Sequence, residues 1–435
     1  MKRLLQPLVL AVTAMLVAVY AYLAWRLGAH SWARVALAVP FLLIWMVPVC
    51  YWGSDREDKG VIHEIVHQAS YLSMAWLSFA FVLTLARDAL LLLTLWSPAL
   101  AAVHAFVNQA GVEAVFAGSL IALAVGALAA YRGPKLVHID VAIEGLHPDL
   151  HGFRIAQISD LHVGRTIGER YVRRVVERTQ ALSADLIALT GDMVDGPVER
   201  LAPGVAPLRE LALERRAFFV LGNHDCYSGA RAWIAHFQAM GIRVLLNAHE
   251  TVSKGDARML VGGVLDPAVA MMHPGQGPRP DLAAQGGEPA AFRLLLAHNP
   301  RIAPAGARAG FDLQLSGHTH AGQFFPWTLA VRLVHAPHVA GLSREGRMWV
   351  YVSAGTGTWG PPVRLGTSPE LTLLRLVRAG GSKVHHPKEG VHGNHSHPPS
   401  AEPARSGPAS QLGARCLRTV RRRPLHCDQL HGAPG

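Results

Sequence analysis

Five short polar motifs occur in order between Asp160 and His320, and each follows an apolar run of strand-like length. They read Ser-Asp-Leu-His at 159–162, Gly-Asp-Met-Val-Asp-Gly at 191–196, Gly-Asn-His-Asp at 222–225, Ala-His-Asn-Pro at 297–300 and Ser-Gly-His-Thr-His at 316–320. The end of a strand would present such side chains together. Residues i and i+2, as in Asp160 and His162, can reach a common point from an extended or turning backbone. The motifs therefore predict one shared site.

The side chains in these motifs are carboxylates, one amide and several imidazoles. This mixture of hard oxygen and borderline nitrogen ligands suits manganese, iron, zinc or magnesium rather than a thiolate-preferring metal. Two such cations, about 3.5–4 Å apart, would clamp the attacking and leaving oxygens of a phosphoryl group. Glycines at 191, 222 and 317 suit tight turns that let the backbone approach the site. The set predicts metal-assisted cleavage of a phosphate ester.

Each motif alone also has a structural explanation. A single histidine is more often a surface or core residue than a ligand, and Gly-Asn-His-Asp could be an ordinary turn. The order of all five motifs, each after an apolar run, favours the metal site.

The same residues resemble the calcineurin-like metallophosphoesterases, whose D-x-H, G-D-x-x-D, G-N-H-[DE], H and G-H-x-H blocks all have counterparts here. The resemblance covers about residues 136–377. It implies a metallophosphoesterase domain at 136–378 with an α/β fold, a four-layer α/β/β/α sandwich with mixed sheets. It also implies two divalent cations, with manganese as the first expectation and iron, zinc or magnesium as alternatives.

The resemblance further implies roles for individual residues. The expected ligands of the first cation are Asp160, His162 and His320. Those expected for the second are Asn223, His298 and His318. Asp192 would bridge both cations. His224 would protonate the leaving oxygen or stabilise transition-state charge, and Asp195 would orient its imidazole. A metal-bridging hydroxide would then attack phosphorus without a covalent protein intermediate.

Residues 153–162 and 355–364 resemble a bacterial membrane-associated branch of the family. Some members of that branch cleave the pyrophosphate of UDP-diacylglucosamine, and others are described as general phosphodiesterases. The implied substrate is a phosphodiester or pyrophosphate, lipid-linked or nucleotide. For Arg364, both a phosphate contact and a structural salt bridge remain open. The rival hypotheses are an inactive membrane scaffold or receptor and a transporter, but no expected ligand is missing.

Apolar residues concentrate in the first 135 positions, which are predicted to form a transmembrane region. A spanning helix takes about 20 residues, and four stretches are long enough. They are Leu4–Leu27, Trp32–Trp52, Ala69–Trp96 and Glu113–Tyr131. A buried soluble helical domain is the alternative, and the start lacks the cleavage site of a secretory signal. The adjacent Arg87 and Asp88 predict a helix break or an interior-facing polar site.

The charges that flank these stretches predict an orientation. With four spans, one side of the membrane carries Lys2, Arg3, Arg56, Lys59, Arg132 and Lys135. The other side carries only Arg26 and Arg34. By the positive-inside rule we expect a multi-pass protein of the inner (plasma) membrane with its catalytic domain in the cytoplasm.

The net charge of +11 does not indicate nucleic-acid binding. Residues 379–435 contain eight Lys or Arg and three acidic residues, and no basic stripe interleaved with aromatics occurs on a folded element. This His/Pro-rich tail is predicted to be disordered. The four cysteines have neither zinc-type nor C-x-x-C spacing.

Short apolar runs alternate with helical patterns in the middle of the chain. The predicted strands are Val137–Ile143, Arg154–Ser159, Leu186–Thr190, Ala217–Leu221, Met259–Val264, Arg293–Ala297, Leu313–Ser316, Met348–Val352 and Leu371–Leu376. The predicted helices are Gly168–Ala181 and Gly229–Met240, and a loop or lid is expected at Asp266–Ala290. This alternation predicts an α/β sandwich with mixed sheets.

Overall fold

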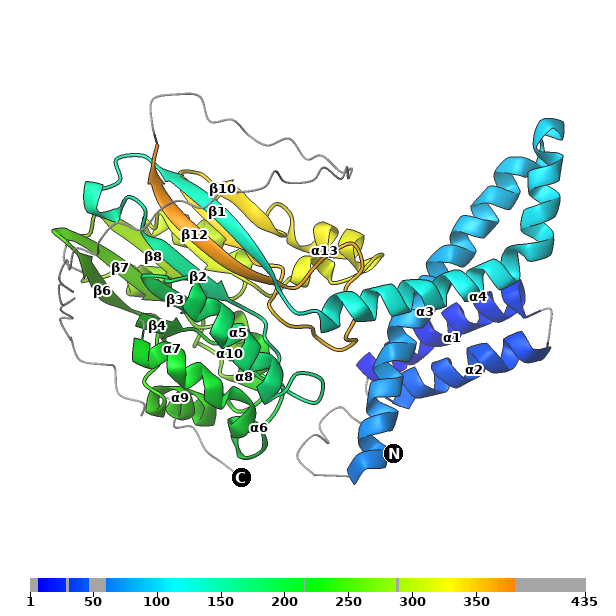
Figure 1. Cartoon of the computed structure of the whole chain (residues 1–435), viewed down its shortest axis with the longest axis horizontal. Coiled ribbons are helices and arrows are strands. Elements are labelled where there is room, and N and C mark those ends of the chain that lie inside the picture. Colours follow the sequence, from blue (N-terminus) through cyan, green and yellow to red (C-terminus); the bar gives the residue numbers. More distant parts are fainter. Residues whose placement is uncertain (1–6, 29–30, 47–59, 215, 287–288, 380–435) are drawn as a thin grey trace, which may run out of the picture.

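The computed structural model describes residues 7–28, 31–46, 60–214, 216–286 and 289–379. Within these residues, an N-terminal bundle of four helices precedes a mixed α/β domain (Figure 1). The bundle helices are α1 (Pro7–Leu27), α2 (Ser31–Met46), α3 (Gly60–Leu95) and α4 (Ala101–Tyr131). The predicted disordered tail lies outside the described residues from position 380 onward.

Two six-stranded mixed sheets form the centre of the α/β domain. The first has the order β1-β12-β2-β3-β4-β5, in which β12 runs antiparallel to β2 while β2, β3 and β4 are parallel. Its strands are β1 (Lys135–Ile143), β2 (Arg154–Ile158), β3 (Leu186–Leu189), β4 (Arg216–Phe219), β5 (Arg243–Val244) and β12 (Glu370–Arg378). The second has the order β10-β11-β9-β8-β7-β6. Its strands are β6 (Ala248–Lys254), β7 (Ala257–Gly263), β8 (Phe292–Leu296), β9 (Leu313–Ser316), β10 (Gly341–Glu345) and β11 (Met348–Val352).

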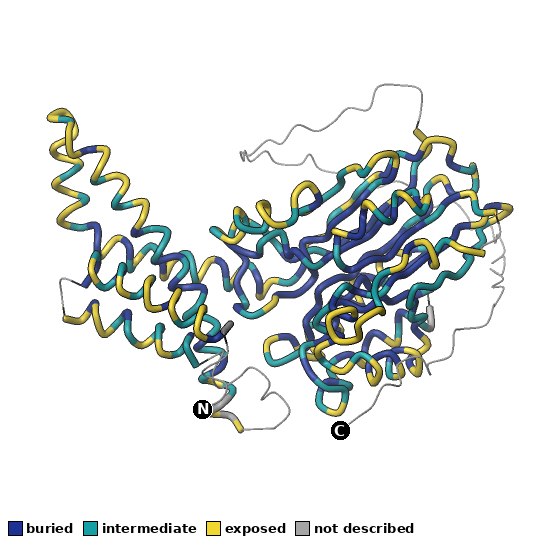
Figure 2. Tube along the Cα trace, turned by 180° about the vertical axis from the view of Figure 1, so that it is seen from behind, coloured by how far each residue is buried: buried dark blue, intermediate teal, exposed yellow. Residues whose placement is uncertain are grey.

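Three apolar clusters separate four layers. One packs the first sheet against α5 (Glu169–Ala181), α6 (Val198–Val205), α7 (Arg209–Glu214) and α9 (Ala230–Ala239). The second lies between the two sheets, and the third packs the second sheet against α11 (Pro280–Ala284) and α12 (Ala303–Arg308). The buried strands run through the middle of the domain in Figure 2. This arrangement confirms the expected α/β/β/α sandwich.

Local sequence explains the elements that were predicted well. In α5, Val172, Val175, Val176 and Thr179 are buried at helical spacing, while the opposite face is charged. All four residues of β3 are buried, as expected for a central strand covered on both faces.

The strands that sequence reasoning missed are β5, β6 and β10, and all three lie at sheet edges. An edge strand tolerates polar and charged residues and therefore lacks a strong apolar signal. The predicted loop Asp266–Ala290 contains two short helices, α10 (Pro267–Met272) and α11. Each begins with a proline, which suits the first position of a helix.

Three segments of the bundle are long and apolar enough to cross a membrane: Val9–Leu27, Glu64–Leu95 and Pro98–Tyr131. Helix α2 is apolar but has 16 residues, and positions 47–52 of its predicted span lie outside the described residues. Side chains of all four helices share one apolar cluster, which includes Leu23, Leu37, Trp76 and Val115.

Helices α3 and α4 begin earlier than predicted, at Gly60 and Ala101. At 36 residues α3 is about 54 Å long, whereas the hydrocarbon core of a bilayer is about 30 Å thick. The predicted break at Arg87 and Asp88 is wrong, because α3 is continuous there. The alternative prediction, an interior-facing polar site, is confirmed, because Asp88 accepts hydrogen bonds from Arg26 at 2.6 Å and Tyr22 at 2.7 Å, both of α1.

The helices and the α/β domain pack directly against each other. Phe79 of α3 meets Phe324 edge-on, with ring centroids 5.5 Å apart. The backbone N–H of Arg364 donates to the carbonyl of Gly126 in α4 at 2.9 Å. A Cβ atom at Gly126 would lie only 2.5 Å from Cγ1 of Val363, so a larger residue would require the packing between α4 and Val363 to shift.

Candidate metal centre

Most of the expected ligands lie just after strand ends, in a left-handed backbone conformation. Strands β2, β3 and β9 end at Ile158, Leu189 and Ser316. The φ angles that follow are 53° at Asp160, 51° at His162, 54° at Asp192, 73° at His318 and 50° at His320. This region costs a residue with a Cβ atom about 1–2 kcal/mol. Such strain persists where the surrounding structure fixes the backbone, which is common at functional sites.

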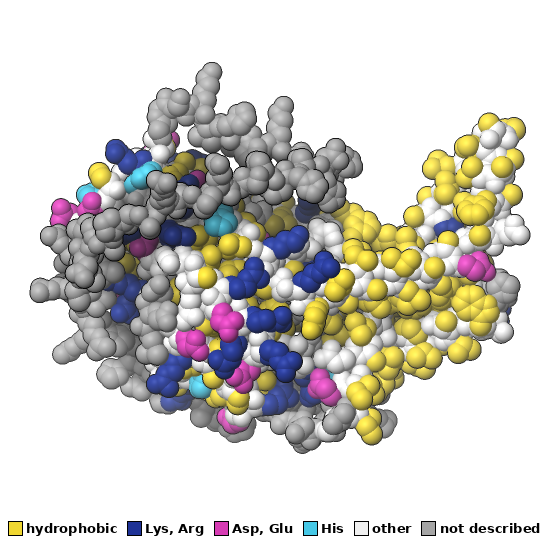
Figure 3. Space-filling view, viewed as in Figure 1, with side chains coloured by type: hydrophobic (Ala, Val, Ile, Leu, Met, Phe, Trp, Pro, Cys, Tyr) yellow, Lys and Arg dark blue, Asp and Glu magenta, His cyan; other side chains and the backbone are white. Residues whose placement is uncertain are grey.

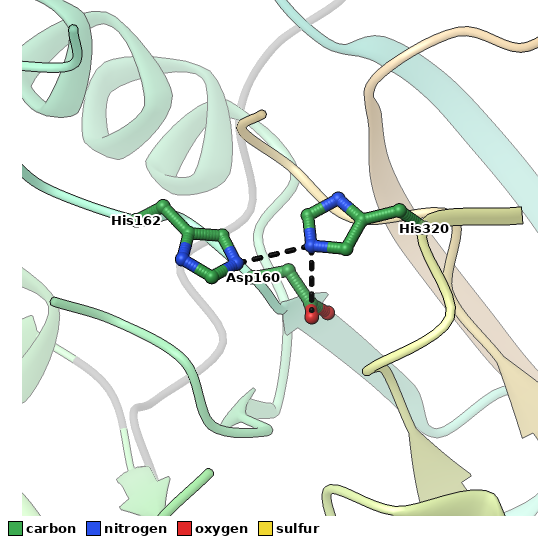
Figure 4. A group of neighbouring side chains, drawn as sticks. All are labelled: Asp160, His162 and His320. Atoms are coloured by element: carbon green, nitrogen blue, oxygen red, sulfur yellow. Dashed lines mark hydrogen bonds and ion pairs between the residues drawn. The ribbon is translucent and has the colours of Figure 1, made fainter. Parts of the chain in front are cut away.

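One group consists of Asp160, His162 and His320, all buried and within ligand reach of one point (Figure 4). The Nε2 atoms of the two histidines are 3.0 Å apart, and Nε2 of His320 is 3.4 Å from Oδ1 of Asp160. The structure thus brings together the three residues expected around the first cation.

A second group consists of Asp192, His298 and His318. Nδ1 of His298 donates to the carbonyl of Thr190 at 2.8 Å, which turns Nε2 toward Asp192 Oδ2, 3.2 Å away. Asn223 joins this group, because its Oδ1 lies 2.9 Å from Nδ1 of His318. All residues expected around the second cation are therefore in one place.

Asp192 lies between the two groups. Its Oδ2 is 3.2 Å from His298 of the second group and 3.8 Å from His162 of the first. Its Oδ1 accepts the backbone N–H of His224 at 2.8 Å. This position suits the bridging role that was predicted for it.

Asp195 contacts two imidazoles at once. Its Oδ1 is 2.8 Å from Nδ1 of His224 and 2.9 Å from Nδ1 of His162. The sequence did not predict the contact between Asp195 and His162. Because this contact occupies Nδ1 of His162, its Nε2 is directed at the other residues of the first group. Burial opposes a charge on His224, but Asp195 and Asp192 outweigh it and raise the pKa of His224 to about 9. His224 can therefore carry a proton at neutral pH.

The protonation states fit a metal centre. Burial, and then His298, lower the pKa of His318 to about 3, and burial lowers the pKa of His320 well below its usual value. Neutral imidazole is the form that binds metals. Burial opposes charge on His298 too, yet Asp192 raises the pKa of His298 well above its usual value. A cation could replace that positive charge and release the proton.

Two buried polar atoms also fit cation binding. Oδ2 of Asp160 and Nε2 of His298 have no partner in hydrogen-bonding geometry within the described part of the chain. Buried polar atoms are normally satisfied, so these two mark positions where cations would bind. The donor set of the two groups, carboxylate oxygen, amide oxygen and imidazole nitrogen, suits divalent cations of the first transition row.

The glycines of the motifs make room for the carboxylates. A Cβ atom at Gly222 would lie 2.1 Å from Oδ1 of Asp192, and one at Gly317 would lie 2.0 Å from Oδ2 of Asp160. Both distances are far below contact, so no larger residue fits. The close approach that was predicted for these turns is confirmed.

Sequence reasoning assigned no role to Asp225, which is fully buried. Its carboxylate accepts backbone N–H groups of Gly222, Asp192, Met193 and Val194 at 2.8–3.2 Å. Burial and the neighbouring Asp192 raise the pKa of Asp225 to about 7 against these donors. Asp225 lies in the short helix α8 (Asn223–Tyr227) after β4, and it thus ties this helix to the loop that carries Asp192. Its place at the end of the Gly-Asn-His-Asp motif was the available signal.

Within the described residues, Arg364 contacts backbone carbonyls rather than a carboxylate, so a structural role without the salt bridge is found, and the phosphate contact stays a prediction. Its side chain is buried and donates to the carbonyls of His320 at 3.0 Å, Ala354 at 2.8 Å and Gly357 at 2.6 Å. Its Nη2 also lies 3.2 Å from Nδ1 of His320. Arg364 therefore positions the turn that carries His320.

The geometry agrees with comparisons to known proteins. A family model described as calcineurin-like phosphoesterase matches residues 153–322. The chain contains a calcineurin-like metallophosphoesterase domain. This phosphoesterase domain includes every residue of the two candidate groups.

Named relatives are metallophosphoesterases of animals and bacteria. A transmembrane protein with metallophosphoesterase domain from Danio rerio is 33% identical over 291 residues, covering 62% of this chain and 66% of that protein. An uncharacterized metallophosphoesterase of Helicobacter pylori is 32% identical over 246 residues, covering 56% of this chain and 64% of that protein. The chain thus spans slightly less than two thirds of these relatives.

A solved structure of a calcineurin-like phosphoesterase from Bacillus subtilis is similar to part of this chain. The similar region covers 47% of this chain and 82% of the Bacillus subtilis chain, with 15% sequence identity and a TM-score of 0.33.

We expect Asp192→Asn to weaken Mn²⁺ binding at least tenfold, because it removes one charged oxygen from a carboxylate shared by both groups. Metal content after desalting and calorimetric titration would measure this, in chains ended after residue 379 to exclude the histidines of the tail. The matched control is Asp312→Asn, because this carboxylate accepts the backbone N–H of Arg293 and belongs to neither ligand group. Equal Mn²⁺ affinity in wild type and Asp192→Asn would contradict the shared site.

Proposed function

We propose that the chain is a membrane-anchored phosphoesterase that uses two divalent cations to hydrolyse phosphodiester or pyrophosphate bonds. The observation that carries this proposal is the arrangement of two ligand groups around Asp192, next to the His224–Asp195 pair. Asp160, His162 and His320 would hold one cation, and Asn223, His298 and His318 the other. Manganese is the first expectation, because the proposed ligands include carboxylate and amide oxygens as well as imidazole nitrogens.

Bound cations would supply an activated water and neutralise charge on the phosphoryl group. The protein's own residues would do the rest. Protonated His224 would donate to the leaving oxygen, and Asp195 would hold its imidazole through the 2.8 Å contact. Asp225 and Arg364 would keep the loops rigid, so that little reorganisation is needed during reaction.

The competing hypothesis is a scaffold or receptor that kept the fold without activity. Such a protein would be free to lose ligands or the proton donor. In this chain the full set is present and converges, which favours the enzyme.

The test is hydrolysis of phosphodiesters by the full-length protein in detergent. We expect turnover of bis(4-nitrophenyl) phosphate with Mn²⁺ and its loss with chelator. His224→Gln should lower kcat about 10²–10⁴-fold on a diester with an alkoxide leaving group, because that oxygen must be protonated as it departs. The loss should be much smaller with 4-nitrophenolate, which leaves without a proton.

The matched control is His273→Gln, an exposed histidine after α10. Absence of turnover from folded protein with every divalent metal would favour the scaffold. Equal losses of kcat for both leaving groups would contradict the proton-donor role of His224. They would not contradict the proposed hydrolysis itself.

We further propose that the substrate is amphiphilic, because an apolar helix lies beside the site. In α13 (Trp327–His335) no residue is buried, and the side chain of Leu333 is 90% exposed. The indole N–H of Trp327 donates to Ser78 of α3 at 3.4 Å, so α13 adjoins a membrane helix. His335 at its end lies 5.2 Å from the ring of His318.

A helix with an exposed apolar face beside a spanning helix can lie in the bilayer interface. We therefore expect Leu333→Glu to lower kcat/KM for a vesicle-bound diacylglycerol 4-nitrophenyl phosphate about tenfold more than for bis(4-nitrophenyl) phosphate. Leu282→Glu on α11 is the matched control, since Leu282 is also exposed but lies on the far sheet's outer face. Equal effects on both substrates would argue against a lipid-linked substrate.

The proposed location is the inner (plasma) membrane, with several spans and the phosphoesterase domain in the cytoplasm. Figure 3 supports this, because Lys and Arg side chains gather over α5, next to the apolar surface of the bundle. They include Arg170, Arg173, Arg174 and Arg178. Basic residues are enriched on the cytoplasmic side of membrane proteins.

A reporter fused after residue 379 tests this orientation in a bacterial host. We expect green fluorescent protein to fluoresce there and alkaline phosphatase to be inactive, because the first matures in the cytoplasm and the second only outside it. The same reporters fused to a single-span protein of known orientation are the control. The reverse pattern would place the domain outside.

A further inference from the structure

Two large aromatic side chains adjoin the imidazole of His224, and both are exposed. The ring of Trp359 meets this imidazole edge-on with centroids 5.6 Å apart, and the ring of Tyr227 does so at 5.9 Å. Trp359 is 50% exposed and Tyr227 is 59% exposed. The proposed proton donor is therefore bordered by aromatic surface that is open to a ligand.

The loop that carries Trp359 is fastened to the candidate metal centre. The N–H of Trp359 donates to Oε1 of Gln323 at 2.9 Å, and its carbonyl accepts from Nε2 of the same side chain at 3.0 Å. Gln323 is 7% exposed, and its own N–H donates to the carbonyl of His320 at 2.8 Å. Earlier in the loop, the N–H of Gly357 donates to the carbonyl of Asp160 at 2.9 Å. The backbone beneath the indole is therefore held by two segments that carry expected ligands.

The aromatic side chains themselves have no such attachment. Within the described residues, neither the indole N–H of Trp359 nor the hydroxyl of Tyr227 forms a hydrogen bond. Tyr227 follows His224 by three residues in α8, so the two side chains share one helix face. A single exposed aromatic residue is ordinary on a protein surface. Two of them beside a proton donor, one on a firmly held loop, are typical of a binding surface.

The position of the two rings restricts what they could contact. Nδ1 of His224 is engaged by Asp195 at 2.8 Å, so Nε2 is the nitrogen that remains for the leaving oxygen. A proton donor lies about 2.6–3.2 Å from the atom that it protonates. The group bonded to that oxygen would therefore lie next to the imidazole, within reach of Trp359 and Tyr227. A planar ring there could pack on them at the usual separation of about 4.5–7 Å between centroids.

Membrane anchoring is the competing explanation for Trp359. Tryptophan is enriched where a bilayer meets water. The next residue, Gly360, lies close to α3, since an added Cβ atom would be 3.7 Å from Cε1 of Tyr71. An anchor would act through its apolar bulk and would not change the choice among leaving groups. The contact between the indole and His224 favours a role at the reacting centre instead.

We infer that Trp359 and Tyr227 bind a planar aromatic ring carried by the leaving group, and that Trp359 is the main determinant of this specificity. The inference rests on the proposed phosphoesterase function, with His224 as proton donor, and adds the residues that select the leaving group. Trp359 contributes the larger part, because its backbone is held on both sides by Gln323 and its indole offers the larger face.

The test compares two diesters whose leaving alcohols have similar acidity but different shape. Methyl phenyl phosphate releases planar phenol, and methyl hexafluoroisopropyl phosphate releases a branched fluoroalcohol. Both reactions form methyl phosphate, which phosphorus NMR measures with the full-length protein in detergent and Mn²⁺. The readout is the ratio of kcat/KM for the phenyl ester to kcat/KM for the fluoroalkyl ester. The change of this ratio on substitution is independent of the intrinsic reactivity of the two esters.

We expect Trp359→Ala to lower the ratio about tenfold, because packing on a ring and its burial together contribute about that factor. Trp359→Phe should keep most of the ratio, since it retains a flat aromatic face. Tyr227→Ala should lower it about threefold. If Trp359→Ala does not fold, Trp359→Leu decides, because leucine keeps apolar bulk without a flat face and should also lower the ratio.

Trp96→Ala is the matched control, because Trp96 is 83% exposed and follows the end of α3 that lies away from the phosphoesterase domain (Figure 1). An unchanged ratio in the Trp359 variants, as expected for a membrane anchor, would overturn the inference. So would equal losses of kcat/KM with both esters, as expected if Trp359 supports His224 alone. Absence of bis(4-nitrophenyl) phosphate hydrolysis by the wild type would instead contradict the proposed function on which the inference rests.

Discussion

The constraint on which the site depends is the burial of several carboxylates in one place. Asp160, Asp192 and Asp225 are all at most 2% exposed. Two like charges 4 Å apart repel by about 4 kcal/mol at the effective dielectric constant of a protein. The structure meets this cost differently for each group. Four backbone N–H groups surround Asp225, and imidazoles flank Asp192. Asp160 keeps one oxygen without a hydrogen-bond partner within the described residues. The remaining negative charge makes this the point where cations would bind.

The same constraint explains the strained backbone. Carboxylates and imidazoles can converge on one point only if the chain turns sharply after β2, β3 and β9, and it does so through left-handed residues. Each such residue costs about 1–2 kcal/mol. The sheets on either side, with their three apolar clusters, hold these turns in place. Bound cations would offset part of the cost, because they stabilise only the folded arrangement.

Central strands and expected ligands could be predicted from sequence because their signals are local. Apolar runs such as Leu186–Leu189 identify buried strands, and a polar pair after each run identifies the site. The edge strands gave no such signal. The roles of Asp225 and Arg364 could not be predicted either, because each side chain forms hydrogen bonds with backbone groups of segments distant in sequence. The contact of α3 with the site joins residues about a hundred positions apart, such as Glu64 and Arg165.

These long-range contacts change the role of the membrane region. Helix α3 is longer than a bilayer requires, and its first turns line a cavity beside Asp195. Helix α4 contacts the backbone of Arg364, whose side chain holds the turn of His320. A phosphoesterase domain separated from the helices would expose Phe324 and Val363, which are 4% and 0% exposed beside them. It would also lose one wall of the cavity. The helices therefore belong to the structure of the site, and membrane attachment and catalytic geometry depend on the same contacts.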